Sequence, residues 1–142
     1  GVKITPIPVY HMKLQDENIP ENELNNTLGF IMEKDRKKIV YLSDYYKLPK
    51  KSFEMINNSD LVIIDGTYLF EEIFPDKPEQ NGEKLDPDHL HGKQILEFIS
   101  TLNSRKIIIN NVTHLPEKTH KELQKLLPKK MFVAYDGMKL TK

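Results

Sequence analysis

The chain has 142 residues, with 21 acidic and 21 basic side chains and no cysteine. A zero net charge gives no overall attraction to nucleic acid or lipid, and the lack of cysteine excludes disulfides and thiolate metal sites. No apolar run approaches the roughly 18 residues of a membrane helix, and the first residues lack a signal-peptide pattern. These features predict a single domain located in the cytoplasm.

The first part of the chain predicts strands. Residues 3–11 have the composition of an edge strand, because Pro6 and Pro8 remove two backbone donors. After a polar, asparagine-rich segment, residues 27–33 and 38–43 predict a hairpin closed by a tight turn.

The middle of the chain predicts a helix, a buried strand and a long loop. Residues 48–58 have helical periodicity. Residues 60–65 are apolar almost throughout, which is typical of a strand buried on both faces. Residues 66–88 contain three prolines and no periodicity, and irregular segments of this length in a compact domain are usually functional or disordered.

The last part of the chain alternates helix and strand. Residues 91–103 and 115–127 have helical periodicity, and residues 105–114 form a second strongly apolar strand. Residues 131–140 predict a strand, an Asp-Gly turn and a last short strand. This order predicts an α/β domain in which helices pack on a mixed sheet.

Polar side chains recur where the predicted strands end, at His11, Asp44, Asp65, His114 and Asp136. If these strands lie side by side and point the same way, their ends meet at one edge of the sheet. Two imidazoles and a carboxylate meeting there suit zinc, manganese or iron. Each residue also has a simpler interpretation as a turn or capping residue, and Asp136 before glycine is most simply a hairpin turn.

Two further histidines, His89 and His91, lie in "DPDHLHGKQ" just before a predicted helix. Unpaired N–H groups at a helix start suit phosphate, and histidine is a natural proton donor at neutral pH. Capping by Asp88 with both histidines in solvent is the competing interpretation. His120 is expected to be a solvated surface residue. A phosphate-accepting receiver-type domain is a rival fold, but the acidic pair expected near its first strand is missing.

Several short motifs occur in a consistent order along nearly the whole chain. They are "PVYHMKL", "TLGFIME", "VYLSDYYKLP", "VIIDGTY", "DHLHGKQILEF", "INNVTHLPEKTH" and "AYDGMKL". In this order they resemble the carboxyl-terminal half of the metallo-β-lactamase superfamily, and most closely its PhnP-type cyclic phosphodiesterases of phosphonate metabolism. The resemblance implies half of an αββα sandwich, with a mixed sheet and helices on its outer face.

The resemblance also implies a metal site with two divalent ions, zinc or manganese. His11 and His114 would each bind one ion, and Asp44 would bridge both. Asp65 would orient a ligand histidine from outside the ligand set.

The same resemblance assigns substrate roles to the helix-start histidines. His89 would be the catalytic proton donor or phosphate contact, and His91 a further substrate contact. Residues 14–26 look like an insertion relative to the family, and the "HxHxDH" motif that supplies most metal ligands is not present in the chain.

The sequence therefore predicts that residues 1–142 are one domain, the carboxyl-terminal half of a metal-dependent phosphodiesterase that acts on a small phosphodiester or cyclic phosphate. An amino-terminal half, or a homo- or hetero-oligomeric partner, would complete the site, and the chain alone would be inactive. The alternatives are a non-catalytic binding subunit of the same fold, expected to take up no metal, and an RNA 3′-processing nuclease, expected to bind RNA in a salt-dependent way.

Overall fold

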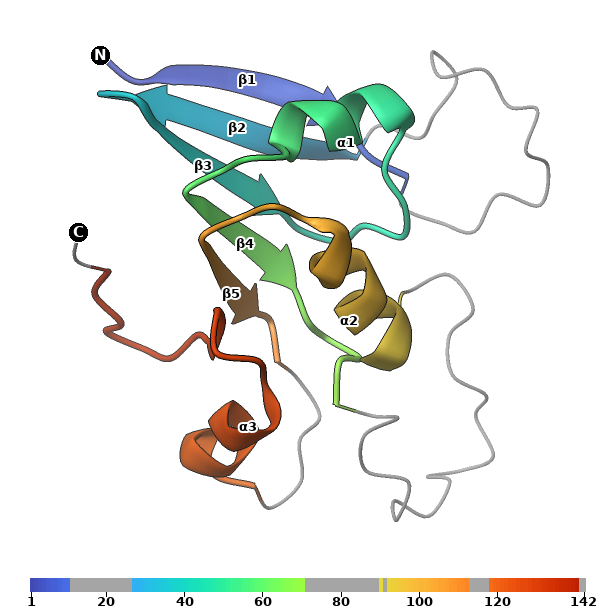
Figure 1. Ribbon diagram of the computed structural model, residues 1–142, viewed down its shortest axis with the longest axis vertical. Helices are drawn as coiled ribbons and strands as arrows, with labels where there is room; N and C mark the ends of the chain where they lie inside the picture. Colours follow the sequence, from blue (N-terminus) through green and yellow to red (C-terminus); the bar gives the residue numbers. More distant parts are fainter. Residues whose placement is uncertain (11–26, 71–89, 91, 113–117, 141–142) are drawn as a thin grey trace, which may run out of the picture.

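The computed structural model describes residues 1–10, 27–70, 90, 92–112 and 118–140. Within these residues the chain forms one six-stranded sheet and three helices (Figure 1). The strands are β1 Lys3–Pro8, β2 Leu28–Lys34, β3 Lys37–Leu42, β4 Leu61–Asp65, β5 Lys106–Asn110 and β6 Met131–Val133. The helices are α1 Lys50–Ile56, α2 Gly92–Thr101 and α3 His120–Leu126.

The strands lie in chain order across the sheet, from β1 at one edge to β6 at the other. β1 pairs antiparallel with β2, and β2 antiparallel with β3, whereas β3 to β6 pair in parallel. Every strand except β2 therefore runs in the same direction, so their carboxyl ends reach one edge of the sheet. This arrangement confirms the predicted mixed sheet.

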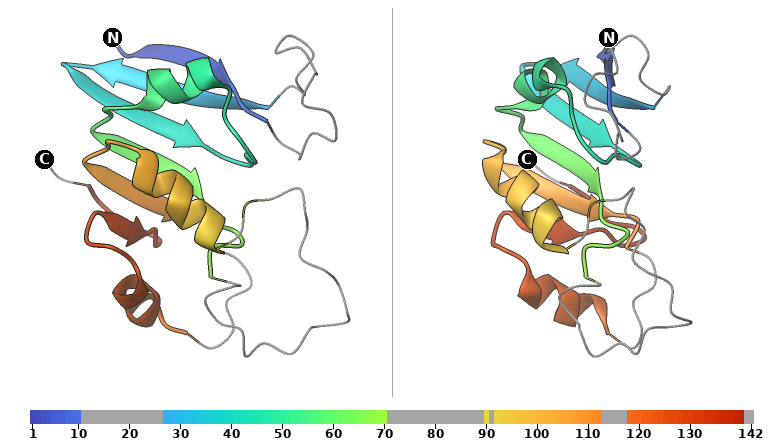
Figure 2. Two further views of the ribbon diagram at one scale, coloured as in Figure 1. Left: turned by 45° about the vertical axis from the view of Figure 1, so that its right-hand side comes forward. Right: turned by 90° about the vertical axis from the view of Figure 1, so that its right-hand side faces the viewer.

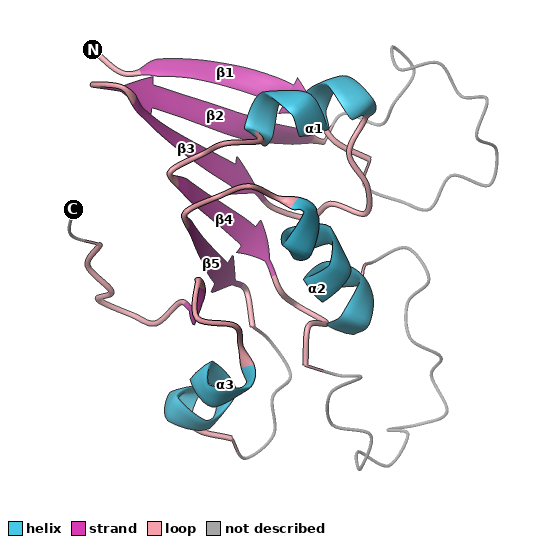
Figure 3. Ribbon diagram, viewed as in Figure 1, coloured by secondary structure: helices cyan, strands magenta, loops and turns pink. Residues whose placement is uncertain are grey.

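Helices α1 and α2 lie over the same face of the sheet (Figures 2 and 3). Alternate strand residues point towards them and are buried with apolar residues of the helices and Leu102, which follows α2. They are Ile7, Ile31, Val40, Val62, Ile64, Ile107, Ile109, Ile56, Ile95, Ile99 and Leu102. Each such side chain contributes about 1.5–3 kcal/mol on burial, so this layer is the main stabilising core.

The opposite face of the sheet is also apolar. One row of paired residues crosses all six strands, namely Pro6, Phe30, Tyr41, Ile63, Ile108 and Phe132. Ile4, which lies on the same face, is 61% exposed, and Phe30 is 37% exposed. The continuously apolar pattern of β4 and β5 is thus explained by two apolar faces, of which α1 and α2 cover one.

Helix α3 lies beside β6 and supports the edge of the sheet. The Gln124 side chain donates to the Met131 carbonyl at 2.8 Å and accepts from the Val133 N–H at 3.1 Å. His120 Nε2 lies 2.9 Å from the Val133 carbonyl, and its ring packs edge-on against Tyr135. The expectation that His120 is a solvated surface residue was therefore wrong, because its ring closes the edge of β6.

At the other edge, β1 presents few backbone donors to solvent. Val9 N–H donates towards β2, to the Thr27 carbonyl at 3.2 Å. Since strand N–H groups alternate in direction, those of residues 6 and 8 would point outward, and both residues are proline. The edge is therefore poorly suited to accept another strand.

Two sequence predictions differ from the structure in the carboxyl-terminal part. Helix α3 begins at His120, because Thr119 and Glu122 form a reciprocal capping box there. The residues after the turn at Gly137 form no strand within 138–140, and the Met138 N–H instead bonds the Tyr135 carbonyl. The Asp-Gly turn itself is present, with φ of 80° at Gly137.

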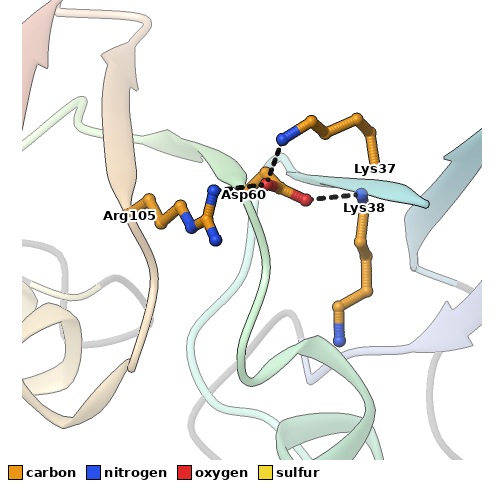
Figure 4. A network of polar contacts seen from close by, with 4 residues as sticks. All are labelled: Lys37, Lys38, Asp60 and Arg105. Atoms are coloured by element: carbon orange, nitrogen blue, oxygen red, sulfur yellow. Dashed lines mark hydrogen bonds and ion pairs between the residues drawn. The ribbon is translucent and has the colours of Figure 1, made fainter. Parts of the chain in front are cut away.

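The amino ends of β3, β4 and β5 are joined by Asp60 (Figure 4). Its carboxylate accepts from Lys37 Nζ at 2.9 Å and from the Lys38 N–H at 3.0 Å, and Arg105 Nη1 lies 3.5 Å away. The hydrogen bond from the Lys37 side chain, followed by that from the Lys38 backbone, lowers the pKa of Asp60 below its ordinary value.

Beside Asp60, two buried serines link the helix ends. Ser59 Oγ donates to the Ile56 carbonyl at 2.5 Å and lies 3.3 Å from Ser104 Oγ. The Ser59 carbonyl accepts from the Arg105 N–H at 3.2 Å. These bonds connect the end of α1 to the segment that follows α2, so the amino-end edge is held by a continuous polar network.

Candidate metal site at the carboxyl edge of the sheet

Four strands deliver polar residues to the carboxyl-end edge. β1 is followed by Tyr10, β3 by Asp44, and β4 ends at Asp65, while β5 is followed by Asn111. Because these strands point the same way, their carboxyl ends lie at one edge of the sheet. This is the arrangement that the sequence-based prediction requires for the polar residues after the strands to meet. Active sites commonly lie at such an edge, held by loops on a rigid sheet.

Asp44 is exposed and has a left-handed backbone conformation, with φ of 51°. Aspartate tolerates this region better than most residues, but the conformation still costs on the order of 1 kcal/mol. The chain bends at Asp44, two residues after β3 ends. A strained carboxylate at a sheet edge is the kind of outlier that functional sites retain.

The end of β1 is tied to the segment that contains Asp44. Tyr10 pairs with Lys47: its N–H donates to the Lys47 carbonyl at 2.9 Å. The Tyr10 carbonyl accepts from the Tyr46 N–H at 2.6 Å. The residue that precedes His11 in the sequence is therefore fixed beside the turn of Asp44, although β1 and this turn are far apart in the chain.

Asp65 joins the ends of β4 and β5. One carboxylate oxygen accepts from the Thr67 N–H at 2.8 Å, and the other accepts from Asn111 Nδ2 at 2.9 Å. Both donors are neutral amides, so these bonds hold the carboxylate without neutralising its charge. Asn111 has φ of 53° and was not singled out from the sequence; the signal available was an asparagine at a strand end, where this residue tolerates the left-handed region.

Gly66 lets the two strand ends approach each other. Its N–H donates to the Asn110 carbonyl at 2.8 Å. A Cβ at this position would overlap Ile109 Cγ2 and lie 3.3 Å from the Asn110 carbonyl oxygen. The Asp-Gly pair therefore places the Asp65 carboxylate directly against the segment that leaves β5.

The four histidines predicted to act in the site, His11, His89, His91 and His114, lie outside the described residues. Asp44 and Asp65 are thus the predicted site residues whose positions the structure gives. Among the described residues no group of three or more His, Asp, Glu or Cys could hold a metal ion. The two carboxylates provide the oxygen ligands that zinc and manganese accept, so the described edge fits a divalent cation in donor type.

Comparisons with known proteins identify the superfamily. The model of the beta-lactamase superfamily domain matches residues 1–110, so the chain belongs to this family. This match confirms the superfamily expected from the sequence motifs. No curated protein sequence matches the chain.

A solved structure with the same fold is the crystal structure of a diphosphatase from the PhnP family. It matches with a TM-score of 0.67 at 23% sequence identity, over 99% of this chain. The match spans only 43% of the diphosphatase chain. The chain therefore spans less than half the length of this solved structure. None of the described helices is long and apolar enough to cross a membrane.

Proposed function

We propose that this chain supplies the carboxyl-terminal part of a metal-dependent hydrolase, a PhnP-like phosphodiesterase that acts on a small phosphodiester or cyclic phosphate. The observation that carries the proposal is the shared direction of β1, β3, β4 and β5, which brings Asp44 and Asp65 to one edge in a chain of this superfamily. The solved structure with the same fold is named a diphosphatase of the PhnP family, which supports hydrolysis at phosphorus as the reaction class.

In this proposal Asp44 and two histidines, His11 and His114, hold two divalent ions, zinc or manganese. When bound, such ions supply Lewis-acid chemistry that offsets the negative charge of a phosphodiester. Asp44 would bridge the ions. Asp65, held by Thr67 and Asn111, would fix the strand ends that carry the ligands.

The substrate roles fall to the two histidines before α2. His89 would protonate the leaving oxygen or contact the phosphate, and His91 would make a further substrate contact. The start of α2 is fixed nearby, because the Gly92 N–H donates to the Tyr68 carbonyl at 3.2 Å, three residues beyond Asp65.

The chain would act together with an amino-terminal half that carries the "HxHxDH" ligands. Two observations support a partner of this kind. The chain spans 43% of the solved relative, and its sheet has a second apolar face with no covering helix among the described residues. A sheet must bury each apolar face against another layer. A second sheet about 10 Å away, packed on the row from Pro6 to Phe132, would satisfy this requirement.

The experiment compares Asp44→Asn with Asp60→Asn in the full-length protein, or in this chain bound to its completing half. Metal content and zinc and manganese affinity are measured, with hydrolysis of bis-para-nitrophenyl phosphate and of a cyclic nucleotide. Asp44→Asn should weaken metal binding by about 100-fold or more, because even residues outside the ligand set contribute 10- to 100-fold. Asp60→Asn should bind metal normally, because Asp60 lies at the opposite end of β4.

The alternatives give different outcomes in the same experiment. Asp44→Asn with unchanged metal affinity would contradict the proposal, and wild-type protein without metal uptake would favour a non-catalytic binding subunit.

An RNA 3′-processing nuclease is the second candidate, favoured by the exposed Lys121 and Lys125 one turn apart on α3. RNA binding that falls steeply with salt would support it.

A further inference from the structure

A cavity of about 610 Å³ lies at the amino-end edge of the sheet. It is lined by the hairpin residues 33–38 together with Lys3, Asn58 and Asp60. Small-molecule sites commonly have volumes of about 300–1,000 Å³. Asp60 directly precedes β4 whereas Asp65 ends it, so the cavity is separate from the candidate metal site at the other end of the strand.

Three residues of this lining have a left-handed backbone conformation. They are Asp35, Arg36 and Asn58, with φ of 49°, 61° and 57°. The other two described non-glycine residues with positive φ, Asp44 and Asn111, lie at the candidate metal site. Each such residue costs on the order of 1 kcal/mol, and backbone outliers gather at functional sites. Within the described residues these outliers thus lie at two places, and the cavity is one of them.

The hairpin turn at the cavity carries a charge where local stability favours none. Asp35 and Arg36 are the two residues between β2 and β3. Their positive φ values fit a two-residue type I′ turn, which asparagine followed by glycine adopts most readily. Arginine at the second position keeps a Cβ where glycine would be unstrained. The retention of a guanidinium there indicates a use for its charge.

The lining has a surplus of positive charge. It contains five basic and three acidic side chains, so its net charge is +2. Glu33 is paired with Lys3 at 3.0 Å. Asp60 is paired with Lys37 at 2.9 Å (Figure 4). Asp35 is the remaining acidic residue of this described lining, and it is exposed in the turn.

Three cations of the lining keep hydrogen-bond donors for a ligand. Among the described residues, neither the Lys34 nor the Arg36 side chain has a hydrogen bond or an ion pair, and both are exposed. Lys38 Nζ donates to the Met55 carbonyl at 3.0 Å and to the Asn57 carbonyl at 2.5 Å. These carbonyls hold the ammonium in place without neutralising it, and they use two of its three N–H groups.

We propose that this cavity binds a phosphate group, either free or on a small ester, through Lys34, Arg36 and Lys38. A phosphate group carries a charge of about −1.5 to −2 at neutral pH, which matches the surplus of the lining, whereas a carboxylate carries a single charge. The guanidinium can bond two phosphate oxygens at once, and the ammonium groups act as point charges. The site does not rest on the proposed function, because the cavity and the metal site share no described residue.

The test uses the two substitutions that the turn itself favours, Arg36→Gly and Asp35→Asn. It is made in the full-length protein, so that any residues ahead of Gly1, which also borders the cavity, are present. Arg36→Gly should weaken binding of inorganic phosphate about 10-fold, because charge-assisted hydrogen bonds are lost. Asp35→Asn should strengthen it about 3-fold, because a like charge is removed. Lys129→Gln, which removes an exposed charge outside the cavity, is the matched control and should change nothing.

Backbone amide NMR shifts of metal-free protein, titrated with inorganic phosphate, locate and measure the binding. Sodium chloride at equal ionic strength is the control for screening. We expect saturable shifts at residues 34–38 that persist in Asp44→Asn. A titration with glycerol phosphate separates the two sources, because tighter binding than inorganic phosphate assigns an ester and equal or weaker binding assigns the free ion.

Three outcomes would overturn the phosphate site. The first is the lack of saturable shifts at residues 34–38, and the second is the same response to sodium chloride as to phosphate. The third is a phosphate affinity that Arg36→Gly and Asp35→Asn leave equal to that of Lys129→Gln. Both turn substitutions relieve or preserve the local backbone conformation, so unfolding would not explain a loss of binding; thermal denaturation of each variant checks this.

Discussion

Asp60 and Asp65 lie at opposite ends of β4, and their partners differ in charge. Asp60 accepts from the Lys37 ammonium and the Lys38 N–H and faces the Arg105 guanidinium, whereas Asp65 accepts from two neutral amides. A carboxylate surrounded by cations has its charge balanced within the protein. One held by amides keeps its charge for another cation. Among the described residues the charge of Asp60 is balanced by cations and that of Asp65 is not, which supports the proposed cation-binding role of the carboxyl-end edge.

The largest effect is expected from Gly66→Ala at the carboxyl-end edge. The added methyl group would overlap Ile109 Cγ2, and β4 and β5 would have to separate. We expect the free energy of unfolding to fall by about 3 kcal/mol, the upper range for overpacking, and metal binding to weaken with it. Chemical denaturation and metal titration measure the two effects. Gly1→Ala, where nothing lies within 4 Å, is the control, and a stable Gly66→Ala variant would disprove the close approach.

A smaller effect is expected from Ser59→Ala at the amino-end edge. The substitution removes a buried hydroxyl that bonds the Ile56 carbonyl and contacts Ser104. The loss should be about 1 kcal/mol of unfolding free energy, measured by denaturation, with metal affinity unchanged. A change in metal affinity here would contradict the division of roles between the two edges.

The smallest effect, and the one that depends on pH, is expected from Asp60→Asn. Its ion pairs are partly exposed, with 25% of the Asp60 side chain accessible, so solvent and salt screen them. Since folding lowers the pKa of Asp60 below 3.8, its stabilisation is present above that pH and is lost as pH falls through the lowered value. Wild type and Asp60→Asn should therefore differ at neutral pH and converge in acid, as thermal denaturation would show. A difference in stability between wild type and Asp60→Asn that persists unchanged in acid would exclude the ionised Asp60 carboxylate as its cause.

Much of the fold could be predicted from residue patterns. The prolines of β1 and the unbroken apolar runs of β4 and β5 indicated an edge strand and two central strands, and the sheet order agrees. The start of α3 was predicted at residue 115 from helical periodicity, whereas the capping box of Thr119 and Glu122 starts the helix at His120. Helix α3 buries Leu123, whereas Leu126 on the same helix is 42% exposed.

The candidate site could be predicted only in part. Asp44 and Asp65 were found because a carboxylate directly after an apolar strand is visible in the sequence. The hydrogen bond between Asp65 and Asn111 could not be predicted, because it depends on β4 and β5 being neighbours in the sheet. The burial of Tyr45 was hidden for a similar reason, because it depends on α2 placing Phe98 against the tyrosine ring.

The prolines of β1 and the α3 side chains on β6 have a consequence for self-association. Copies that added strand to strand would grow into filaments, since each addition exposes a fresh end. The edge strand β1 lacks two outward N–H groups, and the side chains of Gln124 and His120 hydrogen-bond the backbone of the other edge strand, β6. In the proposed assembly, attachment across the apolar face would therefore be favoured over strand addition at the described edges, and a single covering layer would complete the stack.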